Sequence, residues 1–466
     1  MARNAIVGAL FASTLLAALV GCGGDTTSPP LPVAASRGGR DSLATLVRQL
    51  TAGRGITQLG RPPRVRPALV RLGRVLAFDK ILSGNHDIAC MTCHLPAFAT
   101  GDARSLSIGQ GATGLGPSRT HPQGSFIPRN APSLFNLSAL QPLFWDGRVQ
   151  RDEQGSYHTP AGAHLTSDMT RVFEFGTLSA QPLFPVLSRS EMRGDGGNEL
   201  AAIDDANEPA VWRGLMARLG EIRRYRQLFE AAYPGQRFEE MTFAHASNAM
   251  AGFFVARLSF NDSPWDRFLA GDDHALSPVQ MQGAKNFMSA RCSVCHNGPE
   301  LTDNKFHNVA LAQVGPGKGD GAGGQDDFGR MRVTGSPADR YAFRTSPLRN
   351  VELTGPYGHD GAYTDLRAFV DHYSESDVKL RNFDVNQLEA ALRSTRQATT
   401  NDILATRDPL LLGVVFTPQT IDEVAEFMKA LTDPAARQLR RIAPRQVPSG
   451  LPVDGGSEGM GDDDDR

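Results

Sequence analysis

The sequence predicts a mostly α-helical, loop-rich protein with two domains. Several segments repeat apolar residues at helical spacing, and none has the sustained alternation of a strand. Stretches rich in glycine and proline separate these segments, and the 466 residues include 48 glycines and 30 prolines. The pentapeptides Cys90–His94 and Cys292–His296 share the pattern CxxCH about 200 residues apart. Each domain is therefore expected to carry one of these motifs.

The predicted helices either lead into these motifs or close the fold. Pro67 suits the first turn of a helix, and the apolar residues after it recur at helical spacing. The glycine-rich segment Gly315–Gly329 has neither a preceding strand nor the Lys-Ser/Thr pair of a phosphate-binding loop. We expect a plain loop there. The other expected helices are Trp212–Tyr233, Met241–Phe260, Val279–Ala290 and Thr417–Leu431.

Each CxxCH motif predicts one covalently attached haem. Two thiols add to the vinyl groups of one haem, and the adjacent histidine reaches the iron. Zinc is the weaker interpretation, because the sequence offers no further cysteines to complete a closed shell. A disulfide framework does not suit a chain this long with only five cysteines. The predicted haem-binding residues are Cys90, Cys93 and His94 for one haem, and Cys292, Cys295 and His296 for the other.

The N-terminus predicts export. Residues 1–21 have an early arginine, an apolar run and the ending Leu-Val-Gly before Cys22, as in a bacterial lipoprotein signal peptide. Cys22 would become the lipidated N-terminus and anchor the chain to a membrane. An ordinary secretory signal, which leaves Cys22 as a free thiol, is the alternative. Gly23, and not an aspartate, directly follows Cys22, so we expect a periplasmic protein anchored to the outer membrane.

The remaining boundaries follow from composition. We expect a flexible tether at residues 22–45, an N-terminal domain at 46–238, a C-terminal domain at 239–443 and a disordered acidic tail at 444–466. A partner-docking role for the tail is the alternative. The formal net charge is −2, and the sequence has no basic stripe, so nucleic acid is not an expected partner.

Five stretches, in this order, resemble the bacterial dihaem cytochrome c peroxidase and MauG superfamily. The resemblance runs from about Pro67 to Asp433 and implies two cytochrome c-like domains, each with one covalent haem. It also leaves a homodimer open. The stretches are Leu72–Lys80, Arg129–Asn136, Phe144–Arg148, Asp262–Gly271 and Ser346–Gly361.

The resemblance implies a role for each matching residue. His94 and His296 would be the proximal iron ligands; the first haem would meet peroxide and the second would supply electrons. Trp145 would lie between the haems. Gln181 and Glu191 would be the distal residues of the peroxide pocket, where a carboxylate can move a proton during O–O cleavage.

The resemblance also implies a calcium site between the haems. Asn130 would supply a side-chain oxygen, and Thr354 and Pro356 would supply backbone carbonyls, which are the hard donors that Ca²⁺ prefers. His359 matches a family histidine near this site, without a defined role.

The chain departs from the family's peroxidases at three places. The segment 146–180 is longer, and its Tyr157, His158 and His164 could cover the pocket or hold a partner; a surface loop is the other interpretation. Tyr373 stands where conventional enzymes place a methionine ligand of the second haem, a feature of the MauG-like branch, and His372 is the competing ligand. His121 lies near the position of a histidine that blocks the first iron in conventional enzymes. Its spacing differs by one residue, so it is either that ligand or a loop residue.

The resemblance therefore implies an exported dihaem c-type peroxidase of the MauG-like branch. Such an enzyme would reduce H2O2 at the His94 haem and use high-valent iron to oxidise an aromatic side chain of a partner protein, or a small donor. The first alternative is a conventional cytochrome c peroxidase that detoxifies H2O2 with electrons from a small cytochrome or cupredoxin. The second is a non-enzymatic dihaem electron carrier, against which the pair Gln181 and Glu191 argues.

Overall fold

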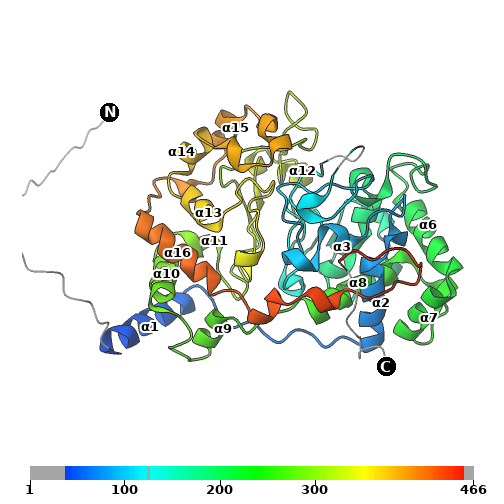
Figure 1. The fold of residues 1–466 in the computed structure, drawn as a ribbon, viewed down its shortest axis with the longest axis horizontal. Helices are drawn as coiled ribbons and strands as arrows, with labels where there is room; N and C mark the ends of the chain where they lie inside the picture. The colour runs from blue at the N-terminus through cyan, green and yellow to red at the C-terminus, as the bar shows by residue number, and fades with distance from the viewer. Residues whose placement is uncertain (1–36, 121, 123–125, 456–466) are drawn as a thin grey trace, which may run out of the picture.

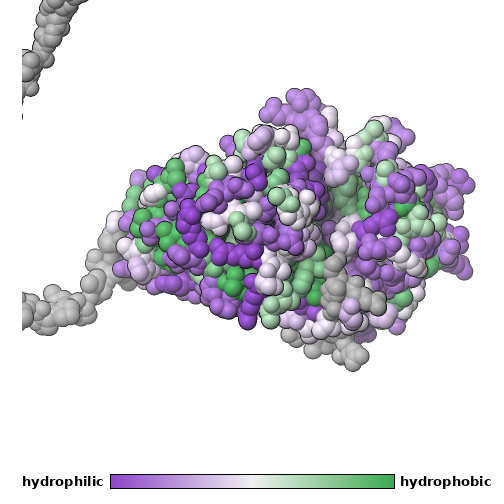
Figure 2. All heavy atoms as spheres, turned by 90° about the horizontal axis from the view of Figure 1, so that it is seen from above, coloured by the Kyte–Doolittle hydropathy of each residue, from purple (hydrophilic) through white to green (hydrophobic). Residues whose placement is uncertain are grey.

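Two lobes lie side by side in the computed structural model, which describes residues 37–120, 122 and 126–455 (Figure 1). The described residues are helix-rich and contain only two short antiparallel hairpins, so the prediction of a mostly helical, loop-rich chain is confirmed. Figure 2 shows a narrow furrow between the lobes. The predicted signal peptide, Cys22, His121 and the acidic end of the chain lie outside the described residues, and the predictions about them stay predictions.

The helices are short, and loops and single 3-10 turns connect them. The hairpins are β1 (Gln150–Arg151) with β2 (Tyr157–His158) and β3 (Phe306–His307) with β4 (Phe343–Arg344). No helix in the described ranges combines the length and the apolar composition needed to cross a bilayer. The helices are α1 (Arg37–Ala52), α2 (Pro67–Phe78), α3 (Cys90–Cys93), α4 (Ser167–Thr170), α5 (Thr177–Ala180), α6 (Glu208–Glu221), α7 (Arg223–Ala232), α8 (Phe243–Arg257), α9 (Pro264–Leu269), α10 (Pro278–Ser289), α11 (Cys292–Cys295), α12 (Met331–Thr334), α13 (Leu366–His372), α14 (Ser376–Arg381), α15 (Thr400–Ala405) and α16 (Pro418–Lys429).

Each lobe is built around a close crossing of two helices. In the first lobe α2 crosses α8 at Gly73, where an added Cβ would lie 1.8 Å from the carbonyl oxygen of Ala249. In the second lobe α10 crosses α16 at Gly283, where an added Cβ would lie 1.8 Å from the carbonyl oxygen of Glu423. In both lobes the glycine-bearing helix is the one that precedes a CxxCH motif, so a close backbone approach fixes the motif against the core.

The helix starts follow local sequence chemistry. Proline occupies the first turn of α2, α9, α10 and α16, where its missing N–H would be unpaired in any case. Hydroxyl side chains cap three of these helices: Ser263 accepts from Asp266 N, Ser277 from Gln280 N and Thr417 from Thr420 N. The helices predicted near Pro67, Met241, Val279 and Thr417 are therefore present with small shifts at their ends. The single helix predicted at Trp212–Tyr233 is wrong, because Ile222 adopts an extended conformation and separates α6 from α7.

Each end of the described chain packs against the lobe that is more distant from it in sequence. Ala44 and Val47 of α1 are buried in the hydrophobic cluster of the second lobe, beside α10. At the other end, Ala436, Leu439 and Val447 are buried in the cluster of the first lobe. Figure 1 shows both crossing segments running below the lobes.

These crossings correct the predicted boundaries. The tether prediction is wrong for residues 41–45, because they belong to α1 and Ala44 is buried. The disordered-tail prediction is wrong for residues 444–455: Asp454 forms an ion pair with Lys80 at 2.7 Å and accepts a hydrogen bond from Thr92. Helix α8, assigned from sequence to the C-terminal domain, is packed in the cluster of the first lobe.

Candidate active site

The two CxxCH motifs have the same local geometry. Each forms one short helical turn, α3 or α11, that ends at the histidine. His94 donates from Nδ1 to the carbonyl oxygen of Thr100 at 2.9 Å, and His296 donates from Nδ1 to that of Leu301 at 2.9 Å. Burial lowers the pKa of both imidazoles. Each ring is therefore held neutral and oriented, with Nε2 as the atom available to a metal.

A mostly apolar cavity adjoins each motif. Cys90, Cys93 and His94 line the first cavity, and Cys292, Cys295 and His296 line the second. Two thiols, one oriented imidazole and an apolar hollow are the set that a c-type haem needs. The described residues therefore fit one haem in each cavity.

The first cavity brings the predicted distal residues to its motif. Gln181 and Glu191 both line it. Glu191 lies on a single π-helical turn, Arg189–Arg193. Ser188 Oγ caps the start of this turn by accepting a hydrogen bond from Glu191 N at 3.3 Å. The loop at Gly109 packs directly on this turn, since an added Cβ there would lie 1.7 Å from the carbonyl oxygen of Ser190. The carboxylate is thus carried on a supported backbone, as an acid–base group requires.

The second cavity distinguishes the two candidate axial ligands. Tyr373 lines it, and burial raises the pKa of its phenol. His372 points elsewhere: its Nδ1 bonds to the hydroxyl of Tyr363 at 2.9 Å, and its Nε2 bonds to the carbonyl oxygen of Val309 at 2.8 Å. Both ring nitrogens of His372 are used by the protein, so Tyr373 is the side chain of the two that faces the cavity.

Trp145 belongs to the partition between the cavities. It lines both of them. Its indole Nε1 donates to the carbonyl oxygen of Asn130 at 2.9 Å, and its own carbonyl oxygen accepts from Arg344 N at 2.8 Å. One hydrogen bond from the indole and one to the backbone therefore hold Trp145 between the two cavities; its position between two haems stays a prediction.

The chain matches known proteins over most of its length. The family model described as di-haem cytochrome c peroxidase matches residues 67–274. The cytochrome c551 peroxidase of Pseudomonas aeruginosa is 30% identical over 325 residues, which cover 69% of this chain and 77% of that protein. The chain belongs to the dihaem cytochrome c peroxidase and MauG family. It is accordingly a dihaem peroxidase, an oxidoreductase, and the family predicted from the five stretches is confirmed.

Relatives from the MauG side of this dihaem peroxidase family match as well. The methylamine utilization protein MauG of Methylorubrum extorquens is 27% identical over 385 residues, covering 81% of this chain and 90% of that protein. Among solved structures, a MauG-like protein associated with microbial copper homeostasis superposes with a TM-score of 0.57 at 26% identity, covering 82% of this chain and 94% of that one. The likeness thus includes both halves of the dihaem fold.

The three residues predicted to bind calcium all line the second cavity. They are Asn130, Thr354 and Pro356. Asn130 donates from Nδ2 to the carbonyl oxygens of Arg104 and Ser105 at 3.0 and 3.2 Å, so its Oδ1 is the side-chain atom that could serve a cation. His359 lies beside them: its carbonyl oxygen accepts from Asn130 N at 2.8 Å, and burial lowers its pKa to about 3.

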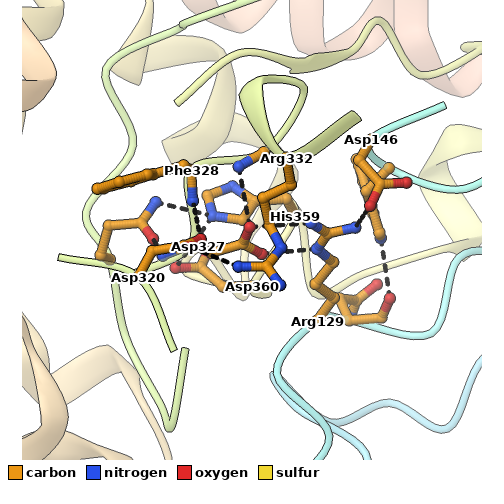
Figure 3. Close-up of polar contacts among 12 residues, drawn as sticks. Arg129, Asp146, Asp320, Asp327, Phe328, Arg332, His359 and Asp360 are labelled. Carbon is orange, nitrogen blue, oxygen red and sulfur yellow. Dashed lines mark hydrogen bonds and ion pairs between the residues drawn. The ribbon is translucent and has the colours of Figure 1, made fainter. Parts of the chain in front are cut away.

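An ion-pair network that the sequence did not reveal joins the two halves of this peroxidase. Arg129 donates from Nε and Nη2 to Asp327 at 2.6 and 2.9 Å, and from Nη1 to Asp146 at 2.6 Å (Figure 3). Despite burial, Arg148 and Arg129 together keep the pKa of Asp146 low, and Arg129 keeps the pKa of Asp327 low. Asp327 lies near the end of the glycine-rich segment Gly315–Gly329, which is a loop as predicted. This loop also places Lys318 in the first cavity.

The inserted segment 146–180 lies largely beside the cavities of the dihaem peroxidase core. Tyr157, His158 and His164 line neither cavity. His158 bonds to Asp152 and His164 to Glu208, each at 2.7 Å on the exposed surface. These contacts favour the surface-loop interpretation for His158 and His164, whereas Tyr157 is half-buried against Phe173. Lys318 and Arg344 are two charged residues of the first cavity that the sequence did not indicate.

Proposed function

We propose that this peroxidase belongs to the MauG-like branch: it reduces H2O2 at the His94 haem with electrons from an aromatic side chain of a partner protein or from a small donor. The overall change is H2O2 + 2e⁻ + 2H⁺ → 2 H2O, with the donor oxidised by two electrons. Bound haem supplies the redox chemistry. The observation that carries the proposal is that Tyr373, which stands where conventional enzymes are expected to have a methionine, lines the second cavity, whereas His372 does not.

The chain's own residues divide the remaining tasks. Glu191, on its supported turn, would take a proton from the inner peroxide oxygen and return it to the departing one. Gln181, in the same cavity, would orient the peroxide by hydrogen bonding. Trp145, fixed in the partition, would shorten the distance over which electrons pass between the cavities.

The same proposal includes the predicted surroundings of the site. One haem would be held in each lobe, and Ca²⁺ would be held by Asn130 Oδ1 and the carbonyl oxygens of Thr354 and Pro356. The chain would be exported and anchored through Cys22, which brings the enzyme to periplasmic partners. The contacts of Asn130 and the common cavity of the three calcium residues support the calcium part.

A resonance Raman experiment on the ferric protein tests the Tyr373 assignment. With excitation in the tyrosinate-to-iron charge-transfer absorption, we expect the enhanced vibrational bands of a bound tyrosinate in the wild type and their loss in Tyr373→Phe. Tyr363→Phe is the matched control, because it removes a buried phenol that contacts His372 and does not line the cavity. Bands that survive in Tyr373→Phe, or that are absent from the wild type, would refute the assignment and favour a conventional cytochrome c peroxidase.

A further inference from the structure

Arg344 is a buried cation without an acidic partner in the part of the chain that the structure describes. Only 7% of the residue is exposed. Its guanidinium reaches two backbone carbonyl oxygens, those of Phe144 and Thr345, each at 3.4 Å. Burial lowers its pKa to about 10. Arg129 is buried to the same degree but holds two carboxylates within 2.9 Å. A buried charge without a counter-ion is strongly unfavourable, so Arg344 requires an anion that the chain itself does not supply.

The position of Arg344 shows where such an anion would come from. Arg344 lines both haem cavities, as Trp145 does. The β3–β4 pairing fixes its register opposite Phe306, and its backbone N–H holds the carbonyl oxygen of Trp145. The guanidinium is therefore anchored in the partition and is accessible from either cavity.

Each of the other cations of the first cavity either has a carboxylate partner or does not reach the second cavity. Arg129 and Arg148 are neutralised by Asp146 and Asp327. Lys318 has no ion pair among the described residues, and it lines only the first cavity. Its backbone is fixed, since Lys318 N donates to the carbonyl oxygen of Asp326 at 2.8 Å.

The cations of the second cavity are likewise satisfied by the protein. Arg349 pairs with Asp266 at 2.8 Å, and Arg291 donates to the carbonyl oxygens of Leu410 and Leu412. Within the described residues, Arg344 is thus the arginine without a carboxylate that both cavities share.

We propose that Arg344 is a counter-ion shared by the propionate groups of both haems, and that it couples their reduction potentials. Each haem carries two propionate carboxylates, and a guanidinium recognises carboxylates through its planar fork of N–H donors. A buried cation favours the reduced state of a nearby iron, because reduction removes one positive charge from the haem. A single arginine close to the propionates of both haems would therefore raise the reduction potentials of both haems. This inference concerns haem binding and potentials, and it stands apart from the proposed peroxide and partner chemistry.

The test is a spectroelectrochemical titration of the holoprotein, with each haem followed through its own electron paramagnetic resonance signal. We expect Arg344→Gln to lower the equilibrium constant for reduction of both haems at least tenfold, which is about 59 mV for a one-electron couple. Haem content and far-ultraviolet circular dichroism show that the variant is folded and loaded. Arg344→Lys keeps the charge and should restore most of both potentials, which a merely structural role would not produce.

Two further variants make the result specific. Lys318→Gln removes a cation that lines only the first cavity, so it should lower the first potential alone. Arg330→Gln removes a partly buried guanidinium that bonds to the neutral oxygens of Asp146, Gly147 and Gln150 outside both cavities, and it should lower neither. The proposal is overturned if Arg344→Gln leaves either potential unchanged, if Arg344→Lys shifts both as far as Arg344→Gln does, or if Lys318→Gln lowers both.

Discussion

Replacement of Arg129 by methionine should destabilise the protein more than loss of any surface ion pair. Methionine keeps an unbranched apolar stem and removes three charge-assisted hydrogen bonds of 2.6 to 2.9 Å. Asp327, which is 2% exposed, would remain charged in the interior without a cation, whereas Asp146, which is 3% exposed, would keep its ion pair with Arg148. Removal of one partner from a buried ion pair costs about 3–5 kcal/mol. Asp327 would keep only its hydrogen bond from Gly329 N at 2.9 Å, which cannot offset that loss.

The assay is equilibrium unfolding in urea, followed by circular dichroism, on wild type and variant with equal haem content. Arg148→Met is the matched control. Its guanidinium also bonds to Asp146, but at 3.2 Å and with the side chain 23% exposed, so solvent screens the pair. The reasoning is refuted if Arg129→Met lowers the free energy of unfolding by less than about 1.5 kcal/mol, or by no more than Arg148→Met does.

Three other predictions follow from the same structure. Gly283→Ala should cost about 1–3 kcal/mol or more in unfolding free energy, because its Cβ would overlap the carbonyl oxygen of Glu423, whereas Gly60→Ala, with open space around it, should be nearly neutral; equal effects would contradict the close crossing. Burial raises the pKa of Asp360 from 3.8 to about 8, so its contribution to stability is complete below pH 4 and is lost as the pH rises through 8. Urea midpoints should fall over that range in the wild type and less steeply in Asp360→Asn, and parallel pH profiles would exclude the assignment. Glu191→Gln should slow the reaction with H2O2 by about 10²- to 10⁴-fold in stopped-flow mixing, with haem content unchanged; wild-type rates would remove Glu191 from the proton transfer.

The parts of the fold that the sequence predicted are those encoded by local chemistry. CxxCH spacing, a first-turn proline and hydroxyl caps each act within a few residues, so they located both motifs and the helices that lead into them. Family resemblance added Trp145, Gln181 and Glu191, and the structure places all three on the wall of the first cavity.

The parts that the sequence did not predict depend on contacts between distant segments. Nothing local indicates that α1 packs on the second lobe, or that Asp454 returns to Lys80 in the first. Lys318 lines the first cavity from a glycine-rich loop whose sequence carries no binding motif. Arg344 becomes a candidate only once the structure shows that it lines both cavities. Ile222 is a single extended residue between two helices, and the only local sign of the break is Gly220 in the last turn of α6.

The proposal that this protein is a MauG-like peroxidase is tested most directly by stopped-flow mixing of the fully oxidised protein with H2O2, without any electron donor. We expect a rapid and long-lived change in the Soret band, because Gln181 and Glu191 line the first cavity and Tyr373 lines the second. A protein that stays unchanged until one haem is reduced would contradict the account. That result would place this chain with the conventional cytochrome c peroxidases, with His121 as the first candidate for a blocking ligand.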